Sequence, residues 1–342
     1  MKKPLAIIFN DAHLKTGNEQ DVIQSVKHML KHAKSKKITD IIFAGDLFDS
    51  RSFQRQSVLH AFDEILDLIN KAGCTLYLFP GNHDKTVYAS YDSFLDVYRH
   101  YPSVVFNREL SVIELGGFKI TLLPFFSDDM LIPMLEEAEG TDVLISHFEM
   151  AGSTHLGNTS VKTTINKDLL SKWKKVYLGH YHNHHEITED IVHLPSLRQT
   201  SFGEDDYKGF SILFDDLSYE VIEGDFKRFR KIIININDTN TSEIAELIRV
   251  HGNGQDTVRF EFIGDENKLK ALDKSQFNDS GIDVKIKYEV KYNYDDSSLQ
   301  LPTVVEHYGE DQVKEAFKAF CDEKGYEHKD GIVLLNEFLK TK

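Results

Sequence analysis

The chain is poor in cysteine and in long apolar runs. Its 342 residues include only two cysteines, Cys74 and Cys321, which are too few and too far apart for a disulfide framework or a thiolate metal site. No apolar run approaches the ~20 residues of a membrane-spanning helix, and the apolar stretch after Met1 is too short for a signal peptide. These absences predict an intracellular, cytoplasmic protein with no membrane partner.

The chain also lacks positive charge. It has 40 Lys and Arg against 55 Asp and Glu, a net charge of −15, which excludes a global positive field that would draw the protein onto nucleic acid. Carboxylates are also metal ligands, however, and seven of the 16 histidines lie between His147 and His193. This concentration of imidazoles favours a metal site, although any single histidine is more simply explained as a surface residue.

Over the first 220 residues, short apolar runs alternate with helical patterns, which predicts an α/β fold. The helical patterns cover Gln20–Lys34 and a stripe from Val58 to Ile69 that Gly73 ends. The predicted strands are Leu5–Phe9, Ile41–Ala44, Thr75–Phe79, Lys119–Leu123, Val143–Ser146, Val176–Leu178, Ile191–Leu194, Phe210–Phe214 and Tyr219–Ile222. The last three are closely spaced, which favours an antiparallel second sheet.

The basic run Lys227–Lys231 marks a predicted domain boundary. Beyond it, alternating apolar patterns predict a small β-α-β-α-β layer. Its strands would be Lys231–Asn237, Thr257–Ile263 and Asp283–Tyr292, and its helices Ser242–Val250 and Glu266–Asp273. A polar linker, Asp295–Thr303, and two short helices follow. The predicted domains are therefore residues 1–226, 227–294 and 295–342.

Five polar patterns follow predicted strands. They are Asp11-Ala12-His13, Gly45-Asp46-Leu47-Phe48-Asp49, Gly81-Asn82-His83-Asp84, Ser146-His147 and Gly179-His180-Tyr181-His182. Because ligands gather at the carboxyl ends of strands in α/β sheets, these side chains are expected to meet. The glycines before Asp46, Asn82 and His180 predict tight turns in which the backbone closely approaches a bound ion or phosphate.

In this order, the five patterns resemble the motifs of the calcineurin-like metallophosphoesterases. The resemblance implies a four-layer α/β/β/α sandwich and two divalent metal ions. Asp11, His13, Asp46 and His182 would hold one ion, and Asp46, Asn82, His147 and His180 the other. Independently, a bridging carboxylate suits two cations about 3.5–4 Å apart that clamp a phosphoryl group. Mixed imidazole and oxygen ligands favour Mn, Fe or Zn over Mg.

A narrower resemblance follows the last motif. The segment His193–Phe210 is similar to a signature of SbcD-type DNA repair nucleases, with a proline-serine turn, Ser201-Phe202-Gly203-Glu204 and a Lys-Gly-Phe strand. The glycine usual after the proline is absent, since Ser196 follows Pro195 directly.

This second resemblance implies a homodimeric, Mn²⁺-dependent nuclease that cuts at DNA ends, as an exonuclease with endonuclease activity, in double-strand break repair and recombination. It also implies a small α+β capping domain for DNA recognition. A C-terminal helical tail, residues 303–342, would bind an SbcC-type (Rad50-like) ATPase.

Further residues beside the motifs have expected roles. His83 is expected to stabilise charge on the phosphate or to protonate the departing 3′ oxygen. Asp49 is expected to hydrogen-bond His83 and raise its pKa, and Asp84 to orient a metal ligand. Candidate DNA contacts, for which surface solubility is the alternative explanation, are Lys15, Arg51, Arg55, Lys85 and Arg198.

Two other functions stay open. One is a phosphoprotein phosphatase or small-molecule phosphodiesterase of the same fold, although protein phosphatases usually have Asp-Arg-Gly where this chain has Asp49-Ser50-Arg51. The other is a non-catalytic scaffold. Scaffolds of this kind tend to have lost metal ligands, whereas all seven expected ligands and His83 are present here.

Overall fold

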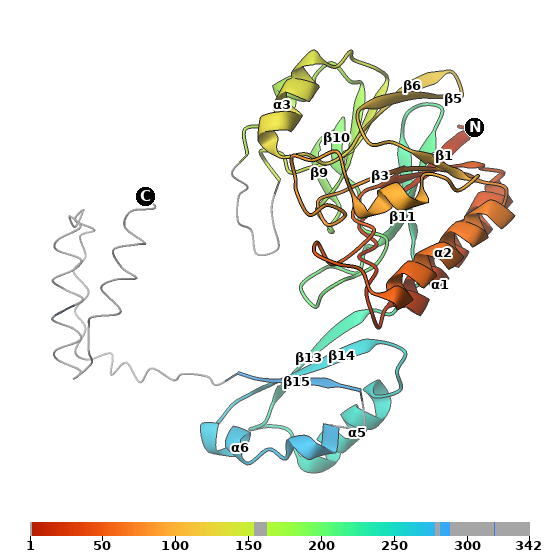
Figure 1. Cartoon of the computed structure of the whole chain (residues 1–342). Coiled ribbons are helices and arrows are strands. Elements are labelled where there is room, and N and C mark those ends of the chain that lie inside the picture. Colours follow the sequence, from red (N-terminus) through yellow and green to blue (C-terminus); the bar gives the residue numbers. More distant parts are fainter. Residues whose placement is uncertain (1, 154–162, 278–280, 288–317, 319–342) are drawn as a thin grey trace. The chain divides into compact units, whose positions relative to one another are not determined.

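The computed structural model describes residues 2–153, 163–277, 281–287 and residue 318 (Figure 1). The chain divides into a compact unit of residues 1–289 and a second unit of residues 290–342. The predicted linker and tail helices fall in the second unit and, Lys318 apart, outside the described residues. Among the residues described, no helix has both the length and the apolar character needed to cross a membrane.

Two six-stranded sheets form the body of the first unit. One sheet contains, in spatial order, β12 (Tyr219–Glu223), β11 (Gly209–Phe214), β1 (Pro4–Phe9), β2 (Asp40–Ala44), β3 (Thr75–Phe79) and β4 (Val104–Phe106). The other contains β5 (Ser111–Leu115), β6 (Phe118–Leu123), β7 (Val143–His147), β8 (Lys175–Gly179), β10 (Ile191–His193) and β9 (His185–Thr188). The central strands are parallel in both sheets, so their carboxyl ends share one edge.

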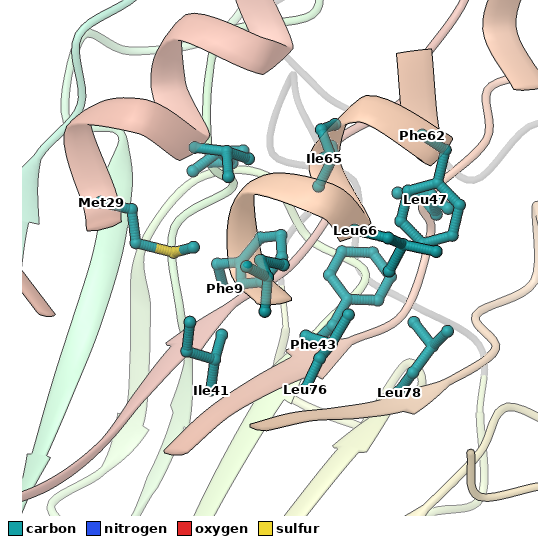
Figure 2. Packing of buried hydrophobic residues seen from close by; sticks show 14 of the residues in the cluster. Phe9, Met29, Ile41, Phe43, Leu47, Phe62, Ile65, Leu66, Leu76 and Leu78 are labelled. Atoms are coloured by element: carbon teal, nitrogen blue, oxygen red, sulfur yellow. The ribbon is translucent and has the colours of Figure 1, made fainter. Parts of the chain in front are cut away.

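Helices α1 (Glu19–Lys36) and α2 (Gln56–Lys71) lie side by side over one face of the first sheet (Figure 1). Met29 from α1 and Leu66 from α2 pack onto Phe9 and Phe43 of the sheet, as Figure 2 shows. Full burial of one such apolar side chain contributes about 1.5–3 kcal/mol to the stability of the fold. The apolar stripes predicted from the sequence are therefore the faces that bury these helices.

Alternate residues of the same strands point to the opposite face, because successive side chains of a strand alternate. Ile8 and Ile42 pack against Ile145 and Tyr177 of the second sheet. The far face of the second sheet is covered by α3 (Asp128–Glu137), α4 (Lys167–Leu170) and their neighbours. The order helix, sheet, sheet, helix confirms the predicted four-layer α/β/β/α fold.

The closely spaced strands do not form a separate antiparallel sheet, so that prediction was wrong. β10 runs parallel to β8 within the second sheet. β11 pairs antiparallel with β1 and thereby extends the first sheet. β11 also pairs antiparallel with its close neighbour β12, but its other partner, β1, is about 200 residues away in the sequence. Short spacing therefore gave no information about which sheet these strands join. The aromatic stretch 91–101 contains a 3₁₀ turn, η1 (Phe94–Tyr98).

A third, smaller sheet follows residue 228. Its strands β13 (Phe229–Asn235), β14 (Thr257–Ile263) and β15 (Asp283–Ile286) are parallel. Helices α5 (Thr241–His251) and α6 (Glu266–Lys270) and the 3₁₀ turn η2 (Lys274–Phe277) complete it, with their own buried apolar cluster. This is the β-α-β-α-β layer expected from the sequence. The division of the chain at residues 226 and 294 stays a prediction.

Candidate metal centre

The loops after β1, β2, β3, β7 and β8 all meet at the shared carboxyl edge of the two sheets. The backbone there is unusual, because Asp11, His13, Asp46 and His180 have φ angles of 50°, 44°, 60° and 87°. Six non-glycine residues have positive φ in the described part of the chain, and these are four of them. Such left-handed residues are strained and tend to cluster at functional sites.

Asp11, His13 and His182 form one cluster, with ligand atoms that lie within 4.8 Å of one another. Nε2 of His13 lies 3.7 Å from Asp11 Oδ1 and 3.0 Å from Nε2 of His182. Asp46 Oδ2 lies 3.7 Å from the same His13 nitrogen. Oδ1 of Asp11 is buried and has no hydrogen-bond partner. A buried carboxylate oxygen facing ring nitrogens fits a bound cation.

Asp46, His147 and His180 form a second cluster, which also includes Asn82. His147 Nε2 lies 3.3 Å from Asp46 Oδ2 and 3.1 Å from Asn82 Oδ1. The same amide oxygen lies 3.0 Å from Nδ1 of His180. Asp46 therefore faces both clusters. The structure brings together all seven side chains that the motifs predicted as ligands, in a donor set that suits two divalent cations.

The charges of the site keep its carboxylates ionised. Burial alone would raise the pKa of Asp11, but the nearby charges of His147, His182 and His13 bring it well below its usual range. Burial would likewise raise the pKa of Asp46, and the charge of His147 and a hydrogen bond from it lower that pKa instead. Both carboxylates are therefore ionised, as metal binding requires, whereas His147, whose pKa they raise to about 9, must lose its proton to bind.

The motif glycines are required by the ligands themselves. A Cβ on Gly45 would lie 2.5 Å from Nδ1 of His147, and one on Gly81 would lie 2.2 Å from Oδ1 of Asp46. A Cβ on Gly179 would meet the same His147 nitrogen at 2.7 Å. A close approach at these turns thus exists, and among the protein's own atoms it is made to the predicted ligand side chains.

The outer nitrogens of the ligand histidines are also held. His182 Nδ1 lies 3.0 Å from Glu204 Oε1, and His180 Nε2 lies 3.1 Å from Glu149 Oε1. His147 Nδ1 donates to the carbonyl oxygen of Ala44 at 2.8 Å. Such contacts fix the tautomer and orientation of a ligand. Neither Glu149 nor the role of Glu204 was predicted from the sequence, although Glu204 belongs to the Ser-Phe-Gly-Glu signature.

His83 lies beside both clusters, with its ring 4.7 Å from that of His13. Its Nδ1 donates to the backbone oxygen of Asp49 at 2.7 Å, which leaves Nε2 to accept from Arg51 Nη2 at 2.9 Å. The Asp49 carboxylate instead pairs with Lys15 at 3.0 Å. The expected side-chain bond between Asp49 and His83 is therefore replaced by a backbone bond. The pKa of His83 is lowered by burial, against the expected increase.

Asp84 is fully buried, and its carboxylate accepts four backbone N–H bonds. The donors are Asp46 at 2.9 Å, Leu47 at 3.2 Å, Phe48 at 3.0 Å and Gly81 at 2.9 Å. The carboxylate therefore ties the loop after β2 to the loop after β3. Its contacts are to backbone, and through the backbone it fixes where the Asp46 side chain begins.

The candidate DNA contacts divide into two groups. Lys15, Arg51 and Arg55 are exposed, and the first two contact Asp49 and His83 beside the site. Lys85 and Arg198 are buried, which differs from the prediction that they meet phosphates at the surface. Lys85 Nζ donates to the carbonyl oxygens of Ser90 and Phe125 and lies 3.7 Å above the ring of Phe126. Nε of Arg198 is buried without a hydrogen-bond partner.

A family model described as calcineurin-like phosphoesterase matches residues 6–184, just over half of the chain. The matched stretch contains every side chain of the two clusters. It ends before Glu204 and the third sheet.

Two curated proteins of viral origin are similar to the chain. Exonuclease subunit 1 of Enterobacteria phage T4 is 25% identical over 193 residues, which cover 55% of this chain and 56% of that protein. The match thus spans little more than half the length of the phage subunit. Phosphoesterase 244L of Invertebrate iridescent virus 6 is 20% identical over 250 residues, 69% of this chain and 87% of that protein. A solved dimetal phosphatase of Danio rerio aligns with a TM-score of 0.44 at 10% identity, over 63% of this chain and 93% of its own.

Proposed function

The chain belongs to the calcineurin-like phosphoesterase family, and from this membership we propose that it is a two-metal, Mn²⁺-dependent DNA nuclease. It would hydrolyse phosphodiester bonds at DNA ends, as an exonuclease with endonuclease activity, in break repair and recombination. The family makes the chain a metal-dependent phosphoesterase hydrolase. The likeness to a phage exonuclease subunit supports DNA as the substrate.

One observation carries the proposal: seven predicted ligand side chains converge at the carboxyl ends of five strands, with Asp46 facing both clusters and His83 beside them. Two bound cations supply Lewis-acid polarisation of a phosphate and lower the pKa of water. Asp11, His13, Asp46 and His182 would hold one cation, and Asp46, Asn82, His147 and His180 the other. Four histidines in this set favour Mn²⁺ over Mg²⁺.

His83 and Arg51 are the groups placed to act on the phosphate. The bond from His83 Nδ1 to the Asp49 backbone directs Nε2 toward Arg51, so the substrate side of the ring is defined. Once protonated at Nε2, in place of the bond from Arg51, His83 would stabilise phosphate charge or deliver a proton to the departing 3′ oxygen. Arg51 would neutralise a phosphate oxygen, and the exposed Lys15 and Arg55 would contact flanking phosphates.

The protein would work in the cytoplasm as a homodimer bound to an SbcC-type ATPase. The relative's name, a subunit of an exonuclease, supports a partner, and residues 303–342 are the proposed attachment. The small domain, residues 227–294, would cap the site and help recognise DNA. Because the chain carries a net charge of −15, binding to DNA without a partner is expected to be weak and sensitive to salt.

The second candidate function is hydrolysis of another phosphoester, which the similarity to a viral phosphoesterase favours. A non-catalytic scaffold is less consistent with a complete set of ligands around a buried, unpartnered Asp11 oxygen.

The test compares end-labelled duplex DNA with a p-nitrophenyl phosphomonoester, in Mn²⁺, with and without the ATPase. Purified protein is expected to carry two Mn-class ions and to shorten the labelled DNA. An Asp46→Asn variant, which alters the shared carboxylate, serves as the matched control and is expected to lose both ions and activity. Turnover of the monoester alone would contradict the nuclease assignment, and a protein that binds no metal would leave only the scaffold.

A further inference from the structure

Residues 198–208 form a loop, here termed the bridging loop, that touches both the metal centre and the small domain. On the metal side its buried Glu204 lies 3.0 Å from His182 Nδ1. Because Nδ1 faces this carboxylate, the other ring nitrogen is the one that faces His13 and Asp11. Thr200 Oγ1, which donates to Glu204, lies at the same 3.0 Å from His182 Nδ1. The orientation of a predicted metal ligand therefore depends on Glu204 together with the Thr200 hydroxyl that it holds.

Glu204 is itself tightly held within the loop. Its carboxylate accepts from the backbone N–H of Thr200 at 3.2 Å, from the Thr200 hydroxyl at 2.5 Å and from the Ser201 hydroxyl at 3.2 Å. The fully buried Lys208 donates to Asp205 at 2.9 Å and to Asn183, next to His182, at 2.7 Å. The carboxylate thus has little freedom to follow His182 if the ring moves.

The opposite side of the loop is joined to β13, the first strand of the small domain. Gln199 Oε1 accepts the backbone N–H of Phe229 at 2.8 Å, and its Nε2 donates to the backbone oxygens of Glu204 and Asp205. Arg230 Nη1 donates to Asp206 Oδ2 at 2.7 Å. One side chain, Gln199, therefore spans from the small domain to the residue that holds His182.

Aromatic contacts add to this junction. The ring of Phe202 lies 5.0 Å from that of Phe229, and the guanidinium of Arg259, from β14, lies 4.1 Å from the centre of the Phe202 ring. The basic run that the sequence suggested as a boundary is thus engaged in ion pairs and packing. Arg228 also bonds the backbone oxygen of Asp206 and the Glu223 carboxylate.

We propose that Glu204 is a positioning residue of the metal centre, and that the small domain holds it in place through Gln199 and Asp206. The proposal rests on the proposed function only in assuming that the two clusters bind two cations. It goes beyond that function by making the affinity for the cation at His182 depend on a domain that supplies none of its ligands.

Glu204→Ala tests the first part, with Mn²⁺ binding followed by electron paramagnetic resonance and metal analysis. The cation held by His182 is expected to bind about 10- to 100-fold more weakly, as for other outer partners of metal-bound histidines, while the second cation keeps its affinity. Glu204→Gln retains an oxygen that can accept from Nδ1 and is expected to recover part of the loss. Two cations bound with wild-type affinity in both variants would overturn the proposal. If the alanine variant does not fold, Glu204→Leu, which fills the space but cannot accept from Nδ1, takes its place, and wild-type binding by that variant would overturn the proposal.

Asp206→Ala tests the second part, with Glu223→Ala as the matched control. Both substitutions remove a carboxylate partner of the same basic run, but only Asp206 belongs to the bridging loop. The first is expected to weaken the cation at His182 about threefold or more, and the second to leave its affinity unchanged. If both substitutions weaken this affinity equally, or if neither does, the small domain does not influence the metal centre through Asp206.

These measurements separate the two proposals. A wild-type chain that binds two Mn²⁺ ions but does not cut DNA would refute the nuclease assignment and leave the role of Glu204 intact. If the protein cuts DNA, and binds metal equally well with or without Glu204, the nuclease assignment stands and the role of Glu204 is refuted.

Discussion

Replacement of Asp84 is expected to be among the most damaging single changes in the chain. Its carboxylate is fully buried and accepts four backbone N–H bonds between 2.9 and 3.2 Å from the loops that carry Asp46 and Asn82. Asp84→Ala leaves four buried donors without an acceptor. At about 1–3 kcal/mol for each unsatisfied donor, the loss is at least about 4 kcal/mol, a large part of a typical domain's stability.

Asp84→Asn provides a graded comparison. Oδ2 accepts from Asp46, Leu47 and Gly81, whereas Oδ1 accepts only from Phe48. An asparagine with its oxygen in the Oδ2 position keeps three of these bonds. Its NH₂ group then faces the Phe48 N–H, so two donors meet and the fourth bond is lost. Its expected cost is therefore about 1–3 kcal/mol, well below that of alanine.

The assay is urea unfolding at pH 8, followed by the fluorescence of the buried Trp173, the only tryptophan of the chain. At this pH the wild-type carboxylate is ionised, because burial and the Asp46 charge raise its pKa only to about 7. Mn²⁺ binding is measured on the same samples, and alanine is expected to weaken it. A loss below about 1 kcal/mol for alanine, or equal losses for the two variants, would refute the reasoning.

Three further changes have defined outcomes. His83→Ala should keep both cations by metal analysis while DNA cleavage falls about 10²- to 10⁴-fold, and a loss below tenfold would remove the acid role of His83. Gly81→Ala should displace the shared carboxylate, since its Cβ would lie 2.2 Å from Asp46 Oδ1, and metal analysis should then find fewer than two ions. Burial lowers the folded-state pKa of Lys85 to about 8, so the unfolded chain binds more protons between about pH 8 and 10.5 and wild-type stability should rise with pH there. Urea midpoints of Lys85→Met should lack that rise, and parallel pH profiles for the two proteins would contradict it.

The convergence of the seven candidate ligands could be predicted because the motifs that carry them are local. Each motif follows a short apolar strand, and parallel strands bring such loops to one edge whatever their distance along the chain. Asp11 and His182 meet for this reason, although 170 residues separate them. The strands and the two long helices were equally readable, since their apolar periods match the faces that they bury.

The features that could not be predicted depend on the direction in which a side chain points and on which distant segments of the chain come together. Lys85 follows a site motif, but nothing local shows that its side chain turns inward to the Phe125 carbonyl. The contact of Glu149 with His180 depends on the relative position of two loops. The pairing of β11 with β1 is likewise set by the packed sheets and not by the spacing of strands.

The left-handed turns at Asp11, His13, Asp46 and His180 have a consequence for how the protein responds to metal supply. Each left-handed residue costs of order 1–2 kcal/mol in backbone strain. In the metal-free protein, relaxation of the turns would remove this strain. Cation binding favours the strained form, so the melting temperature should climb with Mn²⁺ concentration. Amide hydrogens at this edge of the sheets should exchange faster after chelation, while those under α1 and α2 keep their protection.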